Sequence, residues 1–229
     1  MLGTILFCLQ QLSGINVVIY FAPEIFKNLG LGSTTGQILA TMGIGLVNLL
    51  VTIIAILYVD KLGRRKLLLL GFAGTSLSLF ALSLFSLNHV AWLSYLSVIC
   101  LMVYIFSFAI SVGPIPHIAM AEIFPLHVRG AGMGMSSMSN WSFNTIVIFS
   151  FPVLHQMFGI EMTFVLYAVI CFLGFIYAYI YMPETRNISL EQIETYIMSG
   201  KPLRFLGRED EEVNAVSTKS ESSLLASTN

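Results

Sequence analysis

The chain has 229 residues and a formal net charge of -1, and 56% of its residues are hydrophobic while only 10% are charged. Residues 67–121 contain no Asp, Glu, Lys or Arg, and a soluble domain of this length could not bury such a run. The composition therefore excludes a soluble globular domain, and the absence of a basic patch gives no indication of nucleic-acid binding.

Six apolar segments follow one another, separated by Gly, Pro, Asn and charged clusters. Each segment is near or above the roughly 20 residues that a membrane-spanning helix needs. The predicted spans are residues 2–26, 37–59, 67–87, 91–123, 131–158 and 162–182. We therefore predict an all-α integral membrane protein with a bundle of six transmembrane helices over residues 1–185.

The first predicted span combines a break at residues 13–14, Ser-Gly, with a polar stripe. At about 100° per residue, four polar residues fall within an arc of about 120°: Gln10, Ser13, Asn16 and Tyr20. Gln11 joins this face only if the cavity is wide or the break turns it inward. Paired carboxamides offer donors and acceptors without a charge, which suits the hydroxyls of a small neutral sugar. The alternative is interhelical hydrogen bonding worth about 1 kcal/mol per contact.

The second span contributes a lone amide, Asn48. Small residues here and in the fifth span are predicted to let helices approach closely. They are Gly43, Gly45, Gly130, Gly132, Gly134, Ser136 and Ser137.

A basic cluster follows the second span at residues 61–66, and further basic residues follow the fourth and sixth spans. Ten of the eleven basic residues fall on one face of the predicted bundle, and only Lys27 lies on the other. Because cationic loops translocate poorly, we predict a cytoplasmic loop over residues 60–66 and a cytoplasmic C-terminus, in a multi-pass protein of the plasma membrane.

The fourth span is interrupted by Gly113-Pro-Ile-Pro116. Proline removes a backbone donor and frees a carbonyl, so the break needs partners from protein or from a wet cavity. The first and fourth spans head the two groups of three helices, and breaks at matching positions indicate a transporter substrate site. A packing kink is the alternative for either break alone. His117 follows the break and is predicted to line the pore as a hydrogen-bonding group rather than as a titrating switch.

Charged residues at the predicted cytoplasmic edge are spaced so that they could form a network. Asp60 and Arg64 stand at i and i+4, while Glu122 and Arg129 flank the turn between the fourth and fifth spans. Pairs that exist in one conformation only would bias an inside-closed state against an inside-open one. The alternative is a solvated positively charged loop.

The fifth span carries Asn140 and Asn144 on one face, with Trp141 beside them. Sugar rings have C–H-rich faces that stack on aromatic rings, so amides beside a Trp would make a suitable cavity lining. The alternative for Trp141 is an anchor at the membrane interface. Cys8, Cys100 and Cys171 all lie in apolar runs, so the sequence predicts no disulfide, metal site or cofactor.

After the sixth span, Ser189 and Gln192 match a capping box, which predicts a short amphipathic helix within residues 186–200 on the cytoplasmic face. Residues 201–229 contain an acidic run and a Ser/Thr-rich end with little apolar content. We predict a disordered cytoplasmic tail there.

These motifs, in this order, resemble the sugar porter branch of the major facilitator superfamily along the last six of its twelve helices. Residues 10–16, Gln-Gln-Leu-Ser-Gly-Ile-Asn, and residues 20–26, Tyr-Phe-Ala-Pro-Glu-Ile-Phe, are similar to its seventh helix. Residues 60–65, Asp-Lys-Leu-Gly-Arg-Arg, resemble the loop after its eighth helix. Residues 113–116 with Ala-Glu-Ile-Phe-Pro at 121–125 resemble its tenth helix, and Pro-Glu-Thr-Arg at 183–186 resembles its exit motif.

The resemblance implies roles for individual residues. It implies that the sugar is bound by Gln10, Gln11, Asn16, Asn48, Trp141 and Asn144. It implies a cytoplasmic gate made of Asp60, Arg64, Arg65, Glu122, Arg129 and Glu184. The family commonly has Trp where His117 stands, a departure that bears on sugar preference.

As a whole, the resemblance implies the C-terminal half of a transporter for a neutral hexose or pentose. Such a half would work by alternating access with an N-terminal six-helix half that this chain does not contain. Proton symport and facilitated diffusion both stay open, because the resemblance places the coupling acid in the other half. The alternative is a non-transporting membrane fragment or a sugar sensor.

Overall fold

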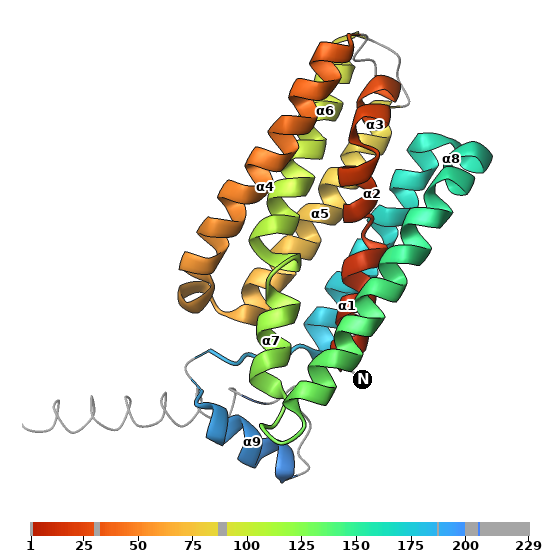
Figure 1. Ribbon diagram of the computed structural model, residues 1–229. Helices are drawn as coiled ribbons and strands as arrows, with labels where there is room; N and C mark the ends of the chain where they lie inside the picture. Colours follow the sequence, from red (N-terminus) through yellow and green to blue (C-terminus); the bar gives the residue numbers. More distant parts are fainter. Residues whose placement is uncertain (1, 30–32, 87–90, 187, 200–205, 207–229) are drawn as a thin grey trace, which may run out of the picture.

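A computed structural model describes residues 2–29, 33–86, 91–186, 188–199 and 206. In this part of the chain the secondary structure is helical throughout. Five stretches are long and apolar enough to cross a membrane: Leu2–Tyr20, Thr34–Val59, Arg64–Ser86, Tyr95–Ile123 and Arg129–Tyr181. The chain is thus a multi-pass membrane protein, and its helices lie side by side in one bundle (Figure 1).

The first predicted span is three short helices rather than one. They are α1 (Leu2–Leu12), α2 (Ile15–Tyr20) and α3 (Ala22–Asn28). The first interruption is at Gly14, which has a left-handed φ of 85°. The second is at Phe21, the N-cap of α3, and Pro23 follows in the first turn of that helix, where a missing N–H costs nothing.

The second and third predicted spans meet almost without a loop. α4 (Thr34–Leu62) is capped at its N-terminus by Ser33, whose side chain accepts a hydrogen bond from the Gly36 amide, and Gly63 follows its last residue as C-cap. α5 (Arg64–Ser86) begins at the next residue. The predicted loop over residues 60–66 is therefore wrong, because a single glycine with φ 86° and ψ 145° reverses the chain. Because Gly63 separates α4 from α5, Asp60 and Arg64 lie on different helices and not one turn apart on the same helix, as was predicted.

The fourth predicted span is divided by a π-helical turn and the Gly-Pro sequence. α6 (Ala91–Ser107) leads into the π-helix η1 (Phe108–Val112), and α7 (Ile115–Ile123) follows after Gly113 and Pro114. A single π-helical turn inside an α-helix often marks a functional site.

The fifth and sixth predicted spans form the two arms of α8 (Arg129–Tyr181). Gly159, with φ 81° and ψ 169°, is the non-helical residue between the arms. Figure 1 shows α8 folding back on itself, so that its second arm runs back along the bundle. Aliphatic side chains and several large aromatic rings form the core, and α5 packs against both α6 and α8.

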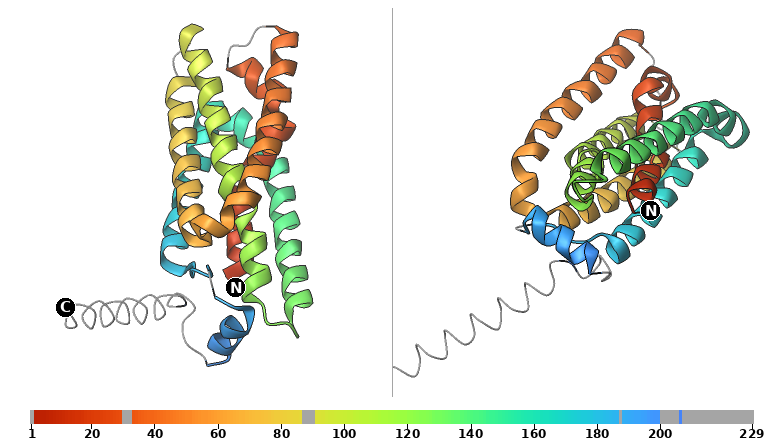
Figure 2. Two further views of the ribbon diagram at one scale, coloured as in Figure 1. Left: turned by 90° about the vertical axis from the view of Figure 1, so that its left-hand side faces the viewer. Right: turned by 60° about the horizontal axis from the view of Figure 1, so that its bottom comes forward.

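The short helix α9 (Leu190–Met198) lies at the same end of the bundle as the start of α1 (Figure 2). The capping box expected from Ser189 and Gln192 is present. Ile193 is buried, and α9 packs against α7. The predicted disordered tail, apart from Leu206, lies outside the described residues.

The predicted small-residue contacts are present at some positions and absent at others. A Cβ atom on Gly132 would lie 2.8 Å from the Phe124 ring, and Ser136 is buried. At Gly45, Gly130 and Gly134, however, the described residues leave open space within 4 Å of an added Cβ. For those three glycines, close packing within this chain was a wrong prediction.

Candidate functional site

At the first helix break, a backbone carbonyl accepts a hydrogen bond from a side chain that is distant in the sequence. Gly14 is left-handed and lies against the ring of Tyr167, where a Cβ atom would come within 2.7 Å of the ring. Glycine is therefore required by both conformation and space. The Ser13 hydroxyl donates to the Gln10 carbonyl at 2.6 Å, and the Tyr104 hydroxyl, from α6, donates to the Ser13 carbonyl at 3.0 Å.

The second break leaves a carbonyl without its helical donor. In an α-helix, the Val112 carbonyl would accept from the N–H of residue 116, which is a proline. The Gln10 amide takes this place: its Nε2 donates to the Val112 carbonyl at 2.9 Å and to the Gly113 carbonyl at 2.7 Å. The ring nitrogen Nδ1 of His117 lies 3.3 Å from the same Gly113 carbonyl.

Four carboxamides form a chain that joins the two breaks to α8. Asn16 Nδ2 donates to Gln11 Oε1 at 2.7 Å, and Gln11 Nε2 donates to Asn140 Oδ1 at 3.0 Å. Asn140 Nδ2 then donates to Gln10 Oε1 at 2.8 Å. The structure thus brings Gln10, Gln11 and Asn16 together, and Gln11 does turn inward.

Asn140 is central to this amide chain although the resemblance did not single it out. It is 8% exposed, and both ends of its carboxamide are used. The sequence signal was its i, i+4 spacing from Asn144. Only the fold shows that it bridges two consecutive glutamines that point in different directions on α1.

Hydrogen-bonding capacity remains around the amide chain. Gln10 uses both N–H groups and accepts one bond, whereas Gln11 and Asn16 each use one N–H. Asn144 is 5% exposed, and its buried Oδ1 has no partner among the described residues. A buried acceptor of this kind is costly unless a ligand or water satisfies it. The remaining groups are neutral donors and acceptors, which suit hydroxyl groups better than ions.

Two predicted sugar-binding residues lie apart from the amide chain. Trp141 is 66% exposed and does not pack in the core of this chain, and Asn48 on α4 is half-buried. The Thr52 hydroxyl donates at 2.7 Å to the backbone carbonyl of Asn48, not to its side chain. Neither residue contacts the four carboxamides through a described hydrogen bond.

A charged cluster lies where α4, α5, α7 and the segment after α8 meet. Arg64 pairs with Glu122, with Nη2 to Oε1 at 2.6 Å, and the two side chains are 12% and 18% exposed. Glu184 Oε1 accepts the Arg64 backbone N–H at 3.0 Å. The Thr185 hydroxyl donates to the second Glu122 oxygen at 2.6 Å. Three of the six predicted gate residues are therefore assembled.

The other predicted gate residues lie elsewhere. Arg65 donates to the Tyr179 carbonyl at 2.7 Å, at the end of α8, and Arg129 donates to the Phe124 carbonyl at 3.0 Å, at the end of α7. A cation at a helix C-terminus is favourable because the carbonyls there carry partial negative charge. The side chain of Asp60 lies outside the described part of the structure.

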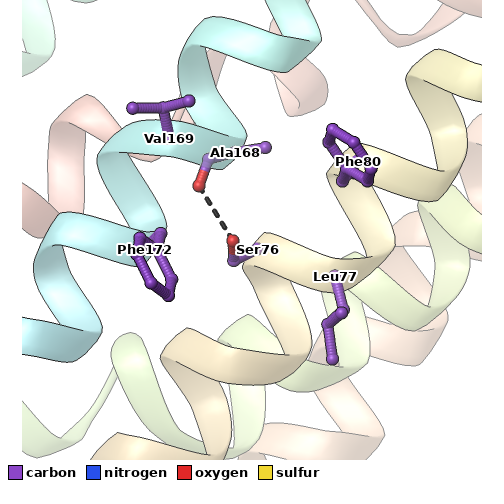
Figure 3. Close-up of a pocket in the computed structure, with 6 residues that line it drawn as sticks. All are labelled: Ser76, Leu77, Phe80, Ala168, Val169 and Phe172. Carbon is purple, nitrogen blue, oxygen red and sulfur yellow. Dashed lines mark hydrogen bonds between the residues drawn. The ribbon is translucent and has the colours of Figure 1, made fainter.

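A pocket of about 210 Å³ lies between α5 and the second arm of α8 (Figure 3). It is lined by Ser76, Leu77, Phe80, Ala168, Val169 and Phe172. Its one hydroxyl, on Ser76, already donates to the Ala168 carbonyl at 2.9 Å. A sugar needs several polar partners, so this apolar pocket does not fit one.

Comparisons with known proteins show which family the chain belongs to. The sequence profile of the family described as "Sugar (and other) transporter" matches residues 1–196. The chain is 40% identical over 188 residues to the D-xylose transporter of Levilactobacillus brevis, covering 81% of this chain and 41% of that protein. It is 37% identical over 213 residues to the galactose-proton symporter of Escherichia coli strain K12, covering 91% of this chain and 46% of that protein.

Solved structures show the same relationship. The proton:xylose symporter XylE of the major facilitator superfamily, bound to 6-bromo-6-deoxy-D-glucose, matches with a TM-score of 0.75 and 32% identity. The match covers 84% of this chain and 41% of that one. The chain thus spans less than half the length of the relatives it matches. Because the family profile covers most of its sequence, the chain belongs to the sugar transporter family, a family of membrane transporters rather than enzymes.

Proposed function

We propose that this chain carries a neutral sugar, a hexose or a pentose, across the membrane as the C-terminal six-helix half of a sugar transporter. The observation that carries the proposal is the buried chain of four uncharged carboxamides at two helix breaks. Breaks of this kind near the middle of a bundle are where transporters bind substrate. The relatives named as transporters of xylose and galactose support the substrate class.

The six crossings of the proposed half are the five apolar stretches with α8 counted as two. Its arms, residues 129–158 and 160–181, have 30 and 22 positions on either side of Gly159. Each arm reaches the roughly 20 residues that a bilayer requires. The relatives are more than twice as long as the matched segment, so the proposal includes a second half as partner, which we take to be N-terminal.

The proposed sugar site contains Gln11, Asn16 and Asn144 as direct contacts, with Asn48 and Trp141 on the side of the cavity that faces the partner half. Gln10 belongs to the same site. The proposed gate is the cluster of Arg64, Glu122 and Glu184, extended by Arg65, Arg129 and Asp60. We place the protein in the plasma membrane, with this gate and the C-terminus on the cytoplasmic side. The reason is that ten of the eleven basic residues fall on that face of the predicted bundle.

Proton coupling, which the symporter relatives suggest, would not use a carboxylate beside the amide chain of this structure. The acidic residues before α9 are Glu24, Asp60, Glu122, Glu161 and Glu184. Each lies in a terminal turn of a helix or beside a helix end or the Gly159 bend, away from the amide chain. A carboxylate of this chain as proton carrier is therefore not part of the proposal.

The test is uptake of radiolabelled glucose, xylose, galactose and fructose into transport-deficient cells. The cells express this chain with and without the N-terminal half of the related D-xylose transporter. We expect saturable uptake that needs both halves and is lost in Asn144→Leu. The matched control is Ser76→Ala, which removes a hydroxyl from the apolar pocket and should leave uptake unchanged.

Absence of uptake in every combination, with both halves shown in the membrane, would refute transport by this pair. Binding of a labelled sugar without uptake would then favour a sugar sensor, and neither binding nor uptake would favour a non-transporting fragment. Uptake by the chain alone would contradict the need for a partner half.

A further inference from the structure

At each of the two helix breaks, backbone carbonyls accept hydrogen bonds from a side chain of the other interrupted helix. At the first break, the Ser13 carbonyl accepts a hydrogen bond from Tyr104 of α6, the helix that leads into the second break. At the second, the Val112 and Gly113 carbonyls accept from Gln10 of α1, the helix that ends at the first break. Each interrupted helix therefore supplies the donor that the other one lacks.

Both donors are buried and well placed for this purpose. Tyr104 is fully buried, and Gln10 is 3% exposed. Along the chain, Gln10 lies three residues before the Ser13 carbonyl, and the Ser13 hydroxyl donates back to the Gln10 carbonyl. A displacement of the end of α1 would therefore move both the carbonyl that Tyr104 holds and the amide that holds Val112.

We propose that Gln10 and Tyr104 are reciprocal positioning residues that couple the two breaks, so that α1–α2 and η1–α7 bend together rather than separately. Gln10 replaces the N–H that Pro116 cannot supply. Its two N–H groups are both used for backbone carbonyls, so a sugar hydroxyl can accept from Gln10 only by taking an N–H from one of them. Substrate occupancy and the geometry of the second break would then compete for one amide.

This inference concerns how the bundle holds its breaks and can be tested without transport. The experiment is hydrogen–deuterium exchange of the purified chain in lipid nanodiscs. Backbone amides on both sides serve as reporters: Ser13, Gly14 and Val18 at the first break, and Gly113 and Ile118 at the second. Each donates to a backbone carbonyl in the intact structure.

Tyr104→Phe removes one hydroxyl and keeps the ring. Because a buried hydrogen bond is lost, we expect protection at the first break to fall about three- to tenfold, with a fall of similar direction at the second. The matched control is Tyr167→Phe, since Tyr167 is also buried but its hydroxyl has no partner among the described residues. That control should change neither break.

A fall in protection at the first break alone would overturn the coupling. So would equal effects of Tyr104→Phe and Tyr167→Phe, because general loosening of the core would then explain both.

A second pair of variants tests Gln10 directly. Gln10→Leu should reduce protection at Gly113 and Ile118, because the Val112 carbonyl loses its donor. Adding Pro116→Ala to Gln10→Leu creates a backbone N–H at the position that an α-helix would use, and we expect protection at the second break to recover. If the double variant stays as unprotected as Gln10→Leu, the replacement role of Gln10 is wrong.

Discussion

The amide chain at the helix breaks and the charged cluster at the end of the bundle connect helices by different chemistry. The amide chain is neutral, and Gln10, Gln11 and Asn140 are each less than 9% exposed. The charged cluster uses Arg64 and Glu122, which keep 12% and 18% of their side chains exposed. Figure 1 shows the breaks partway along the bundle, whereas the α4–α5 junction lies at one end of it.

This difference follows from the cost of burying charge. A carboxylate or guanidinium in the hydrocarbon region is expensive, whereas an amide that is fully hydrogen-bonded is tolerated. At the end of the bundle, water and phospholipid head groups reduce the cost of the ions, and a charge pair gains strength from partial burial. Many weak neutral bonds therefore serve the middle of the bundle, and a few strong ionic ones serve its edge.

The largest expected effect on stability is at the charged cluster. Glu122→Ala removes the carboxylate from Arg64 and from Thr185 at once, and we expect a loss of about 2 kcal/mol in the free energy of unfolding. Equilibrium unfolding in mixed detergent micelles measures it. The control is His127→Ala, which removes the exposed partner of Glu194, 3.7 Å away, and should cost less than about 0.5 kcal/mol. Equal losses would show that partial burial adds nothing to the cluster.

The next effect concerns the single residue that brings Glu184 to Arg64. Gly63→Ala meets a positive φ of 86° and a Cβ contact of 2.7 Å with the Glu184 carboxylate. We expect a loss of about 1–2 kcal/mol. Gly45→Ala is the control: it lies within α4 with open space around an added Cβ, so the better helix propensity of Ala should raise stability slightly. A neutral Gly63→Ala would mean that the α4–α5 turn is not under this constraint.

The smallest effect on stability is expected in the amide chain. It gives the sharper test of the difference between the amide chain and the charged cluster. Asn140→Leu keeps a similar volume but removes two hydrogen bonds. We expect the free energy of unfolding to fall by about 1 kcal/mol in the same measurement. Asn48→Leu, on the half-buried face of α4, should change stability by less. If Asn140→Leu stabilises the bundle, the amides are kept for binding and not for stability.

Much of the site could be predicted from residues that are close in sequence. The Ser13-Gly14 and Gly113-Pro114 breaks were correctly located, because glycine and proline act on the backbone next to them. The polar face of Gln10, Ser13 and Asn16 followed from helical spacing. The loop over residues 60–66 was wrong, because charged residues can continue a helix and only Gly63 interrupts it.

Partners that are distant in sequence could not be predicted. The separation between Gln10 and Asn140 is 130 positions, and that between Arg64 and Glu122 is 58. Spacing within a helix says which face a side chain occupies but not which helix lies opposite. For the same reason, the sequence did not show that Arg65 and Arg129 would bind helix ends while Arg64 paired with Glu122.

The sequence by itself determined that this protein belongs in a membrane, that its helices break at Ser13-Gly14 and at Gly113-Pro114, and that the polar side chains of the candidate site are uncharged amides. These properties depend on composition and on local backbone chemistry, so no contact is needed to predict them. Only the tertiary structure decided that Asn140 joins the two glutamines, that Gln10 takes the place of the missing Pro116 donor, and that Tyr104 holds the other break. Hydrogen bonds depend on distances of about 3 Å between atoms, and those distances exist only once the helices have packed.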